Sequence, residues 1–278
     1  MPLSVVPTPI GNLKDITLRA LEVLKSADLL LCEDTRRALK LLNYYDIKVR
    51  MVSYHEHNER VRVKEVLDML ALGLNVALVS DAGMPCISDP GSILVREAIK
   101  AGFEVDVLPG PSAILPALVM SGLPTERFCF LGFLPDDGKS RREFLTSTGT
   151  LPFTCVFYVA PHKALRDLRD ILDIWGDRQA ALIREISKLH QECRRGSISE
   201  LLENVPGVRG ELVLVVEGST TPPREDESWK AQATCLRGQG MSVKDVAKML
   251  SESYGIEKNR IRKFLLDLER MEEGKDES

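Results

Sequence analysis

The sequence has few of the features that mark secreted, zinc-binding or membrane proteins. Its six cysteines form no Cys-x-x-Cys pair, and several lie inside apolar runs, which is typical of free thiols in a reducing cytoplasm. No apolar run approaches the roughly 18 residues that span a bilayer, and the first residues lack the basic region of a secretory signal. We therefore expect a cytoplasmic protein without a membrane segment.

An excess of charge of one sign is also missing. The chain of 278 residues carries 37 Lys+Arg against 41 Asp+Glu, a formal net charge of −4, and 44% of it is hydrophobic. This balance excludes a protein that binds nucleic acid over its whole surface, and the apolar content excludes disorder. The phosphate loop GxxxxGK[ST], the dinucleotide fingerprint GxGxxG and the nucleophile elbow GxSxG are all absent. The length suggests about two domains.

Short apolar runs alternate along the chain with segments of helical spacing. The runs are nearly continuous, which is typical of strands covered on both faces in largely parallel sheets. Leucine, valine and isoleucine recur at helical spacing in Thr17–Ser26, Glu59–Leu72 and Pro161–Ile174, and Asp15 is the expected cap of the first helix. The class is therefore α/β. The predicted strands are Leu3–Pro7, Asp28–Cys32, Arg50–Ser53, Val76–Ser80, Glu104–Leu108, Phe128–Leu131, Thr154–Tyr158, Ala180–Arg184 and Glu211–Glu217.

Composition predicts five parts. A proline-rich segment near 108–116 separates a first α/β domain, 1–112, from a second, 113–218. Residues 219–228 read as a linker, 229–268 as a helical segment with a start at Met241-Ser242 and a stop at Gly255, and 269–278 as an acidic tail. Residues 229–263 hold eight basic and three acidic residues, which suits a helix-turn-helix that contacts phosphates. A solvated face on a small helical cap remains an alternative.

Four loops after predicted strands have residue types that are unusual for simple connectors, and α/β proteins place their sites at such loops. Their sequences are PTPIGNLKDIT, CEDTRR, SDAGMPCISDPG and PGPSA. The third is long, which makes Asp81 a functional candidate, whereas Asp89 is interpreted as the cap of a helix that begins near Pro90. A plain turn, a surface network of ion pairs or a helix cap at Ser112 would explain the other loops as well.

The segment SYHEHNE raises the possibility of a metal site. His55 and His57 could ligate a metal with the nearby glutamates, but further ligands are missing, since the other histidines are His162 and His190. We expect no metal, and favour a loop that contacts substrate or a helix N-terminus.

Several motifs occur in a fixed order: VPTPIGNLKDITLRAL, EDTR, SYHEHNE, SDAGMPCISDPG, PGPSA, GFLP, REISKLH and GELVLVVEG. Together they resemble the tetrapyrrole methylase-like family, and within it the methyltransferases of small-subunit ribosomal RNA. The resemblance covers almost the whole chain, and the segment from Gly240 to Leu268 is similar to that family's C-terminal helix-turn-helix. The chain departs from the family pattern at Met84, where threonine is usual, and at Val159, where a carboxylate is usual.

The resemblance implies two α/β domains of the tetrapyrrole methylase type with an inter-domain cleft, plus a small C-terminal helical segment. It implies that the cleft holds S-adenosylmethionine, usually within a homodimer, and that the enzyme methylates the ribose 2′-hydroxyl of a decoding-centre cytidine in the 16S rRNA of the small ribosomal subunit. A methyltransferase of tetrapyrrole precursors and a non-catalytic ribosome-binding factor remain alternatives.

The resemblance also assigns residues to roles. Asp34 would accept the ribose proton, and Arg36 and Lys188 would act beside it and meet phosphates. The residues expected to contact substrate are Glu33, His55, Arg184, Lys244 and Arg260. The residues expected to bind the cofactor are Ile10, Gly11, Asp81, Gly83, Met84, Pro85, Ile87, Ser112, Ala113, Tyr158, Val159, Ile183, Glu211 and Leu212.

Overall fold

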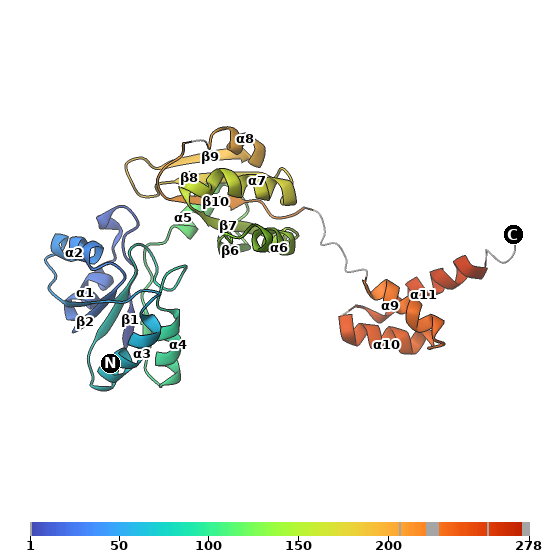
Figure 1. The fold of residues 1–278 in the computed structure, drawn as a ribbon, viewed down its shortest axis with the longest axis horizontal. Helices are drawn as coiled ribbons and strands as arrows, with labels where there is room; N and C mark the ends of the chain where they lie inside the picture. The colour runs from blue at the N-terminus through green and yellow to red at the C-terminus, as the bar shows by residue number, and fades with distance from the viewer. Residues whose placement is uncertain (1, 206, 221–227, 255, 274–278) are drawn as a thin grey trace. The chain divides into compact units, whose positions relative to one another are not determined.

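The computed structural model describes residues 2–205, 207–220, 228–254 and 256–273. It divides into two compact units, Met1–Ser219 and Thr220–Ser278. The first unit contains two five-stranded sheets, and the second contains helices (Figure 1). The predicted boundary after residue 112 falls between the last strand of the first sheet and a helix that packs on the second sheet, and it remains a prediction.

The first sheet is parallel, with the strand order β3-β2-β4-β1-β5. Alternate residues of its strands face opposite layers of helices: in β4, Ala77 and Val79 pack with α1 and α2, whereas Val76 and Leu78 pack with α3 and α4. This two-sided burial explains the continuous apolar runs. The elements are β1 Leu3–Val5, the 3-10 turn η1 Leu13–Asp15, α1 Leu18–Ser26, β2 Leu29–Cys32, α2 Thr35–Tyr44, β3 Arg50–Ser53, α3 Glu59–Ala71, β4 Val76–Val79, α4 Ser92–Lys100 and β5 Val105–Val107.

The cap predicted for the first helix is wrong. Helix α1 begins after Thr17, whose side-chain oxygen accepts a hydrogen bond from the Ala20 N–H at 3.1 Å. Asp15 lies two residues too early to reach these amides. It closes η1 instead, and its carboxylate accepts a hydrogen bond from the Ser187 hydroxyl.

The second sheet has the order β6-β7-β10-β8-β9. Strands β6 and β7 are parallel, but the other neighbouring pairs are antiparallel, so the prediction of largely parallel sheets is wrong here. The continuous apolar runs report burial on two faces and carry no information on strand direction. The elements are α5 Ile114–Ser121, β6 Phe128–Phe133, α6 Gly138–Thr148, β7 Thr154–Val159, η2 Pro161–Lys163, α7 Ala164–Trp175, β8 Gln179–Arg184, β9 Glu192–Ser197, α8 Ile198–Glu203 and β10 Leu212–Val216.

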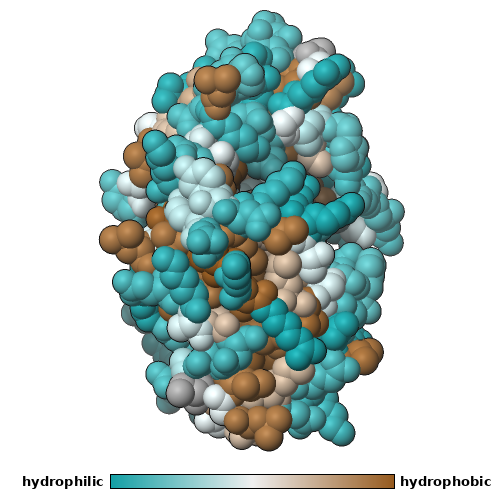
Figure 2. Space-filling model, turned by 90° about the vertical axis from the view of Figure 1, so that its left-hand side faces the viewer, coloured by the Kyte–Doolittle hydropathy of each residue, from teal (hydrophilic) through white to brown (hydrophobic). Residues whose placement is uncertain are grey.

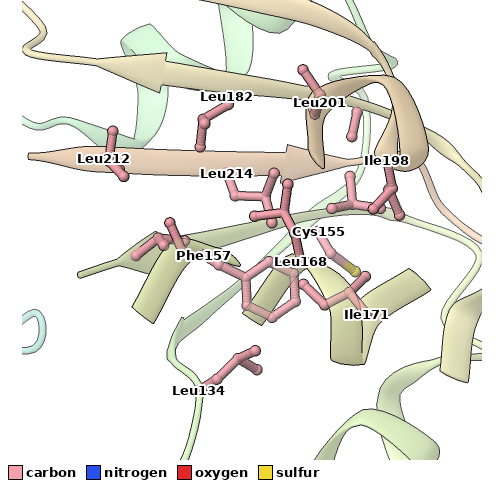
Figure 3. Packing of buried hydrophobic residues seen from close by; sticks show 14 of the residues in the cluster. Leu134, Cys155, Phe157, Leu168, Ile171, Leu182, Ile198, Leu201, Leu212 and Leu214 are labelled. Atoms are coloured by element: carbon pink, nitrogen blue, oxygen red, sulfur yellow. The ribbon is translucent and has the colours of Figure 1, made fainter. Parts of the chain in front are cut away.

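The central strand β10 shows this two-sided burial clearly. Leu212 and Leu214 join a core with residues of α6, α7 and α8, including Leu168 and Ile198 (Figure 3). Val213 on the opposite face packs with residues of α5. Strand β9 was not predicted because its sequence ECRRGS has no apolar run. It lies at the sheet edge, where the Arg195 guanidinium donates to the Met120 carbonyl.

The second unit contains α9 Ser228–Gly238, α10 Val243–Tyr254 and α11 Lys258–Glu273. The predicted start at Met241-Ser242 is confirmed, because the Ser242 hydroxyl accepts a hydrogen bond from the Asp245 N–H at 3.1 Å. The predicted stop at Gly255 and most of the predicted linker lie outside the described residues. Trp229, Val246, Leu250, Ile261 and Leu265 are among the residues of its core. No helix in the described parts of the chain is long and apolar enough to cross a membrane.

Candidate functional site

A cavity of about 330 Å³ lies between loops of the first sheet and residues of the second. Its size falls in the range of small-molecule sites. The parallel strands of the first sheet deliver their following loops to one edge, and two of the predicted site loops contribute most of that side of the wall. The lining residues of the first part are Ile10, Ala82, Gly83, Met84, Ile87, Ser88, Asp89 and Ala113, and those of the second are Phe133, Tyr158, Val159, Ala160, Pro161, Ile186, Glu211, Leu212 and Val213.

The structure brings most of the predicted cofactor residues together. Those that line the cavity are Ile10, Gly83, Met84, Ile87, Ala113, Tyr158, Val159, Glu211 and Leu212. Ile183 and Pro85 are buried and lie outside the lining. Ser112 lines a neighbouring cavity of about 480 Å³ that shares Ile10 and Ile186 with the first. Asp81 lines a smaller cavity of about 110 Å³.

Gly11 holds the two sheets close together rather than lining the cavity. A Cβ atom on Gly11 would lie 2.9 Å from the carbonyl oxygen of Ile186 and would also clash with the Lys188 side chain. Glycine is therefore the residue that lets the loop after β1 contact the loop after β8. This contact sets the width of the cavity, because Ile10 and Ile186 both line it.

A pair of backbone hydrogen bonds fixes the long loop after β4. The Thr8 N–H donates to the Gly83 carbonyl and the Gly83 N–H donates to the Thr8 carbonyl, both at 2.9 Å. The Thr8 hydroxyl also donates to the Ser80 carbonyl at 3.1 Å. Gly83 has a φ of 81°, a left-handed conformation that favours glycine. These contacts hold the two loops in register where they line the cavity.

Asp34 and Arg36 form a local ion pair outside the cavity lining. The Asp34 carboxylate caps α2 and accepts hydrogen bonds from the Arg36 backbone N–H at 2.8 Å and from the guanidinium Nη2 at 2.7 Å. The Arg36 side chain and its backbone N–H lower the pKa of Asp34 to about 2. A carboxylate with so low a pKa is a weak base, which disfavours the predicted role of Asp34 as proton acceptor.

Lys188 lies in a cluster of charges at the cavity wall. Its Nζ contacts Glu185 at 2.9 Å and Glu211 at 3.1 Å, and Glu211 lines the cavity. Burial alone would lower the pKa of Lys188, but the hydrogen bonds to Glu185 and Glu211 outweigh it and raise that pKa. Sequence reasoning missed Glu185, although it lies within the motif REISKLH. Its φ of 52° is unusual for a non-glycine residue and marks a tightly constrained turn.

Asp89 is the second residue that sequence reasoning missed. The predicted cap at Asp89 is wrong, because α4 begins at Ser92 with Gly91 at the N-cap and no side-chain cap. Asp89 lines the cavity instead. Burial, with smaller contributions from Glu33 and Asp81, raises the pKa of Asp89 to about 6, partly opposed by a hydrogen bond with Ser80. The one available signal was a second aspartate in a loop too long for a simple connector.

The predicted substrate residues lie outside the cavity lining. Burial first and Asp81 second raise the pKa of Glu33, which follows β2. The His55 ring lies 3.2 Å from the Asn58 amide, and Arg184 ends β8 with its Nε 3.5 Å from Glu192. Lys244 and Arg260 are exposed on helices of the second unit. No group of three or more metal-ligating side chains occurs among the described residues.

The arrangement of two sheets whose loops line a shared cavity is found in a known family of methylases. The model of the Tetrapyrrole (Corrin/Porphyrin) Methylases matches residues 2–202, and the chain belongs to this family. Its relatives include the ribosomal RNA small subunit methyltransferase I of Halalkalibacterium halodurans, 42% identical over 93% of this chain and 92% of that protein. The protein of the same name from Thermotoga maritima is 50% identical over 78% of this chain and 98% of its own length.

Solved structures show the same fold at lower identity. Uroporphyrin-III C-methyltransferase from Thermus thermophilus matches with a TM-score of 0.56 at 21% identity, covering 78% of this chain and 94% of that one. Diphthine synthase matches with a TM-score of 0.63 at 15% identity, covering 78% and 90%. The Thermus thermophilus enzyme has also been solved in complex with S-adenyl homocysteine.

Proposed function

We propose that this chain transfers a methyl group from S-adenosylmethionine to the 2′-hydroxyl of a decoding-centre cytidine in 16S rRNA. The observation that carries the proposal is the cavity walled by loops of both sheets, in a chain whose relatives at 42–50% identity are named ribosomal RNA small subunit methyltransferase I. The proposed substrate is the small ribosomal subunit. The proposed acceptor within it is the 2′-hydroxyl of the decoding-centre cytidine.

The residues present fit the proposed cofactor. Apolar side chains such as Ile10, Met84 and Leu212 offer contact to a nucleoside, and the aromatic Tyr158 and Phe133 lie 5.4 Å apart between ring centroids. The lining also contains the carboxylate of Glu211, which suits a ligand that carries positive charge. S-adenosylmethionine supplies a methyl group on a positively charged sulfur.

The protein's contribution is then mainly positioning. Loops from both sheets hold the cavity walls through the Gly11 contact and the Thr8–Gly83 hydrogen bonds. Alignment of the acceptor oxygen with the transferred methyl can supply on the order of 7–11 kcal/mol of the barrier. The Lys188 ammonium is held by Glu185 and Glu211, so its proposed contact with phosphate requires a partial exchange of these partners.

The second unit supplies the proposed contact with rRNA. Lys244 and Lys248 are exposed one helical turn apart on α10, and Arg260 is exposed on α11. Such side chains bind phosphates and make the affinity salt-dependent. We expect the helices of Thr220–Ser278 to bind the small ribosomal subunit and to leave the protein's affinity for S-adenosylmethionine unchanged.

A homodimer is the proposed assembly. Hydrophobic residues reach the surface of the molecule among hydrophilic ones (Figure 2). Helix α5 exposes Leu115 and Val119, with 54% and 71% of their surfaces accessible, on the face turned away from the second sheet. Apolar side chains at this spacing form a ridge suited to a second copy of the chain. Sedimentation equilibrium should give a mass close to twice 31.0 kDa.

The deciding experiment supplies methyl-labelled S-adenosylmethionine together with unmethylated small subunits or with uroporphyrinogen III. We expect label in 16S rRNA and recovery of 2′-O-methylcytidine after nuclease digestion. Label in the tetrapyrrole would instead support a tetrapyrrole methyltransferase, and binding to subunits without label would support a ribosome-binding factor. Ala113→Trp, which fills the cavity, should abolish labelling, whereas Leu189→Trp at a residue with 93% of its surface exposed should not.

A further inference from the structure

We propose that the carboxylate of Asp89 accepts the proton that the ribose hydroxyl loses during methyl transfer. This inference rests on the proposed function and deepens it, because a neutral hydroxyl is a poor nucleophile until a base takes its proton. Sequence resemblance assigned this role to Asp34, and the structure points to a different carboxylate on the same edge of the first sheet.

The position of Asp89 is fixed by the loop that carries it. Cys86 and Ser88 adopt φ angles of 70° and 61°, conformations that non-glycine residues adopt only where the surroundings hold them. The loop ends at Gly91, where a Cβ atom would lie 2.6 Å from Leu78 of β4, so this end is packed directly on the core. The Gly91 N–H also donates to Glu59 at 3.3 Å. A carboxylate on so constrained a loop is preorganised.

The other carboxylates of this region are engaged elsewhere. The Asp34 carboxylate caps α2 and also pairs with the Arg36 guanidinium. The Asp81 carboxylate contacts the Arg37 guanidinium at 3.2 Å. Glu211 lines the cavity but contacts Lys188 at 3.1 Å. Glu33 lies outside the lining. Asp89 lines the cavity, and no lysine or arginine among the described residues forms an ion pair with it.

The surroundings of Asp89 make it a stronger base than Asp34. Burial is the largest cause that raises the pKa of Asp89 to about 6, and the charges of Glu33 and Asp81 add to it. Three further titratable groups lie near Asp89. Burial is the main cause that raises the pKa values of Tyr158 and Cys86 to about 12 and 11, so both are neutral at pH 7, and Glu211 lines the same cavity. Asp89 is therefore ionised at neutral pH and binds a proton more tightly than a carboxylate with a pKa of about 2.

The proposed step balances in atoms and charge. The ribose oxygen forms the new O–C bond with a lone pair, the C–S bond of the donor breaks with its electrons left on sulfur, and a neutral thioether departs. The hydroxyl proton moves to a carboxylate oxygen of Asp89, which then releases it to solvent. No oxidant, reductant or metal enters the step.

The test compares Asp89→Asn with wild type, and uses Asp68→Asn as a matched change at an exposed residue of α3. We expect Asp89→Asn to lower kcat by roughly 10²–10⁴-fold, the usual contribution of a general base. Its affinity for S-adenosylhomocysteine, measured by calorimetry, should stay within twofold. The wild-type kcat/KM, which reports the pKa of the free enzyme, should fall about tenfold per pH unit below about pH 6. This limb should disappear in Asp89→Asn, while Asp68→Asn keeps both rate and profile.

Two results would overturn the inference. An Asp89→Asn variant with wild-type kcat and an unchanged acid limb would remove Asp89 from the proton transfer. A parallel loss of affinity for S-adenosylhomocysteine would reassign it to binding the cofactor's ammonium group. The proposed function is judged separately by the wild type: if wild type places no methyl group on ribose in small subunits, the proposed function fails and this role fails with it.

Discussion

Replacing Asp89 with asparagine should stabilise the fold at neutral pH. Asparagine has nearly the same shape but cannot ionise, so it removes the penalty of holding a charge in a partly buried place. The pKa of Asp89 rises from 3.8 to about 6 on folding. A difference of about 2 units corresponds to about 3 kcal/mol at 1.36 kcal/mol per unit, and solvent screening of this partly exposed group reduces it to about 1–3 kcal/mol.

The sign of this effect depends on pH. Below about pH 3 the carboxyl is protonated in both the folded and the unfolded chain, so Asp89 carries no penalty. Between about pH 4 and 6 the unfolded chain ionises first, and stability is lost as pH rises through the folded pKa. The advantage of Asp89→Asn should therefore grow from about zero near pH 3 to its full value above pH 7.

Urea unfolding at pH 4.5 and pH 8 measures this difference directly. The chain has two tryptophans, and Trp229 lies in the second unit, so a Trp229→Phe background leaves the buried Trp175 to report on the unit that contains Asp89. Asp68→Asn, at an exposed residue of α3, serves as the control. The claim that burial destabilises the ionised carboxylate would be refuted if Asp89→Asn did not raise the free energy of unfolding, or raised it equally at both pH values.

Core packing, a close backbone contact and surface charge can each be tested by substitution. Gly11→Ala should weaken binding of S-adenosylhomocysteine at least tenfold in calorimetry, because its Cβ meets the Ile186 carbonyl, whereas Gly138→Ala, whose Cβ has only one distant neighbour, should not. Leu214→Ala should lower the free energy of unfolding by about 2–5 kcal/mol in urea, because the fully buried side chain leaves a cavity, while Leu189→Ala should change it by less than about 0.5 kcal/mol. The double variant Lys244→Ala/Lys248→Ala should bind small ribosomal subunits with a weaker salt dependence in filter binding. The slope of log binding constant against log salt concentration should fall in magnitude by about one for each lost phosphate contact, and the affinity for the cofactor should stay unchanged.

The sequence predicts the sheets well wherever both of their faces are buried. The runs at Val76–Val79 and Leu212–Val216 are continuous because each strand packs against helices on two sides. The same runs contain no information about strand direction, which is why the antiparallel pairing of the second sheet was not predicted. Strand β9 escaped prediction for the opposite reason, since an edge strand with one bonded neighbour needs no apolar run.

The candidate site was predictable at the level of loops and less so at the level of side chains. The parallel first sheet places the loops after β1 and β4 on one edge, so a shared cavity follows from topology. Whether a given residue lines the cavity depends on the direction in which its own side chain points. Ile183 alternates with its neighbours along β8 and faces α5, and this choice of face is set by tertiary packing.

The contrast between Asp34 and Asp89 shows what residue type leaves undetermined. Both are aspartates in loops that follow strands of the same sheet, and the sequence predicts a role for each only from the residues beside it. Asp34 directly precedes a helix and faces Arg36, so its charge is stabilised and its proton affinity is low. Asp89 lies three residues before its helix, too far to cap it, and turns into a cavity where burial destabilises the same charge. A shift of two residues along the loop therefore separates a structural cap from a base, and this offset depends on the left-handed turns at Cys86 and Ser88.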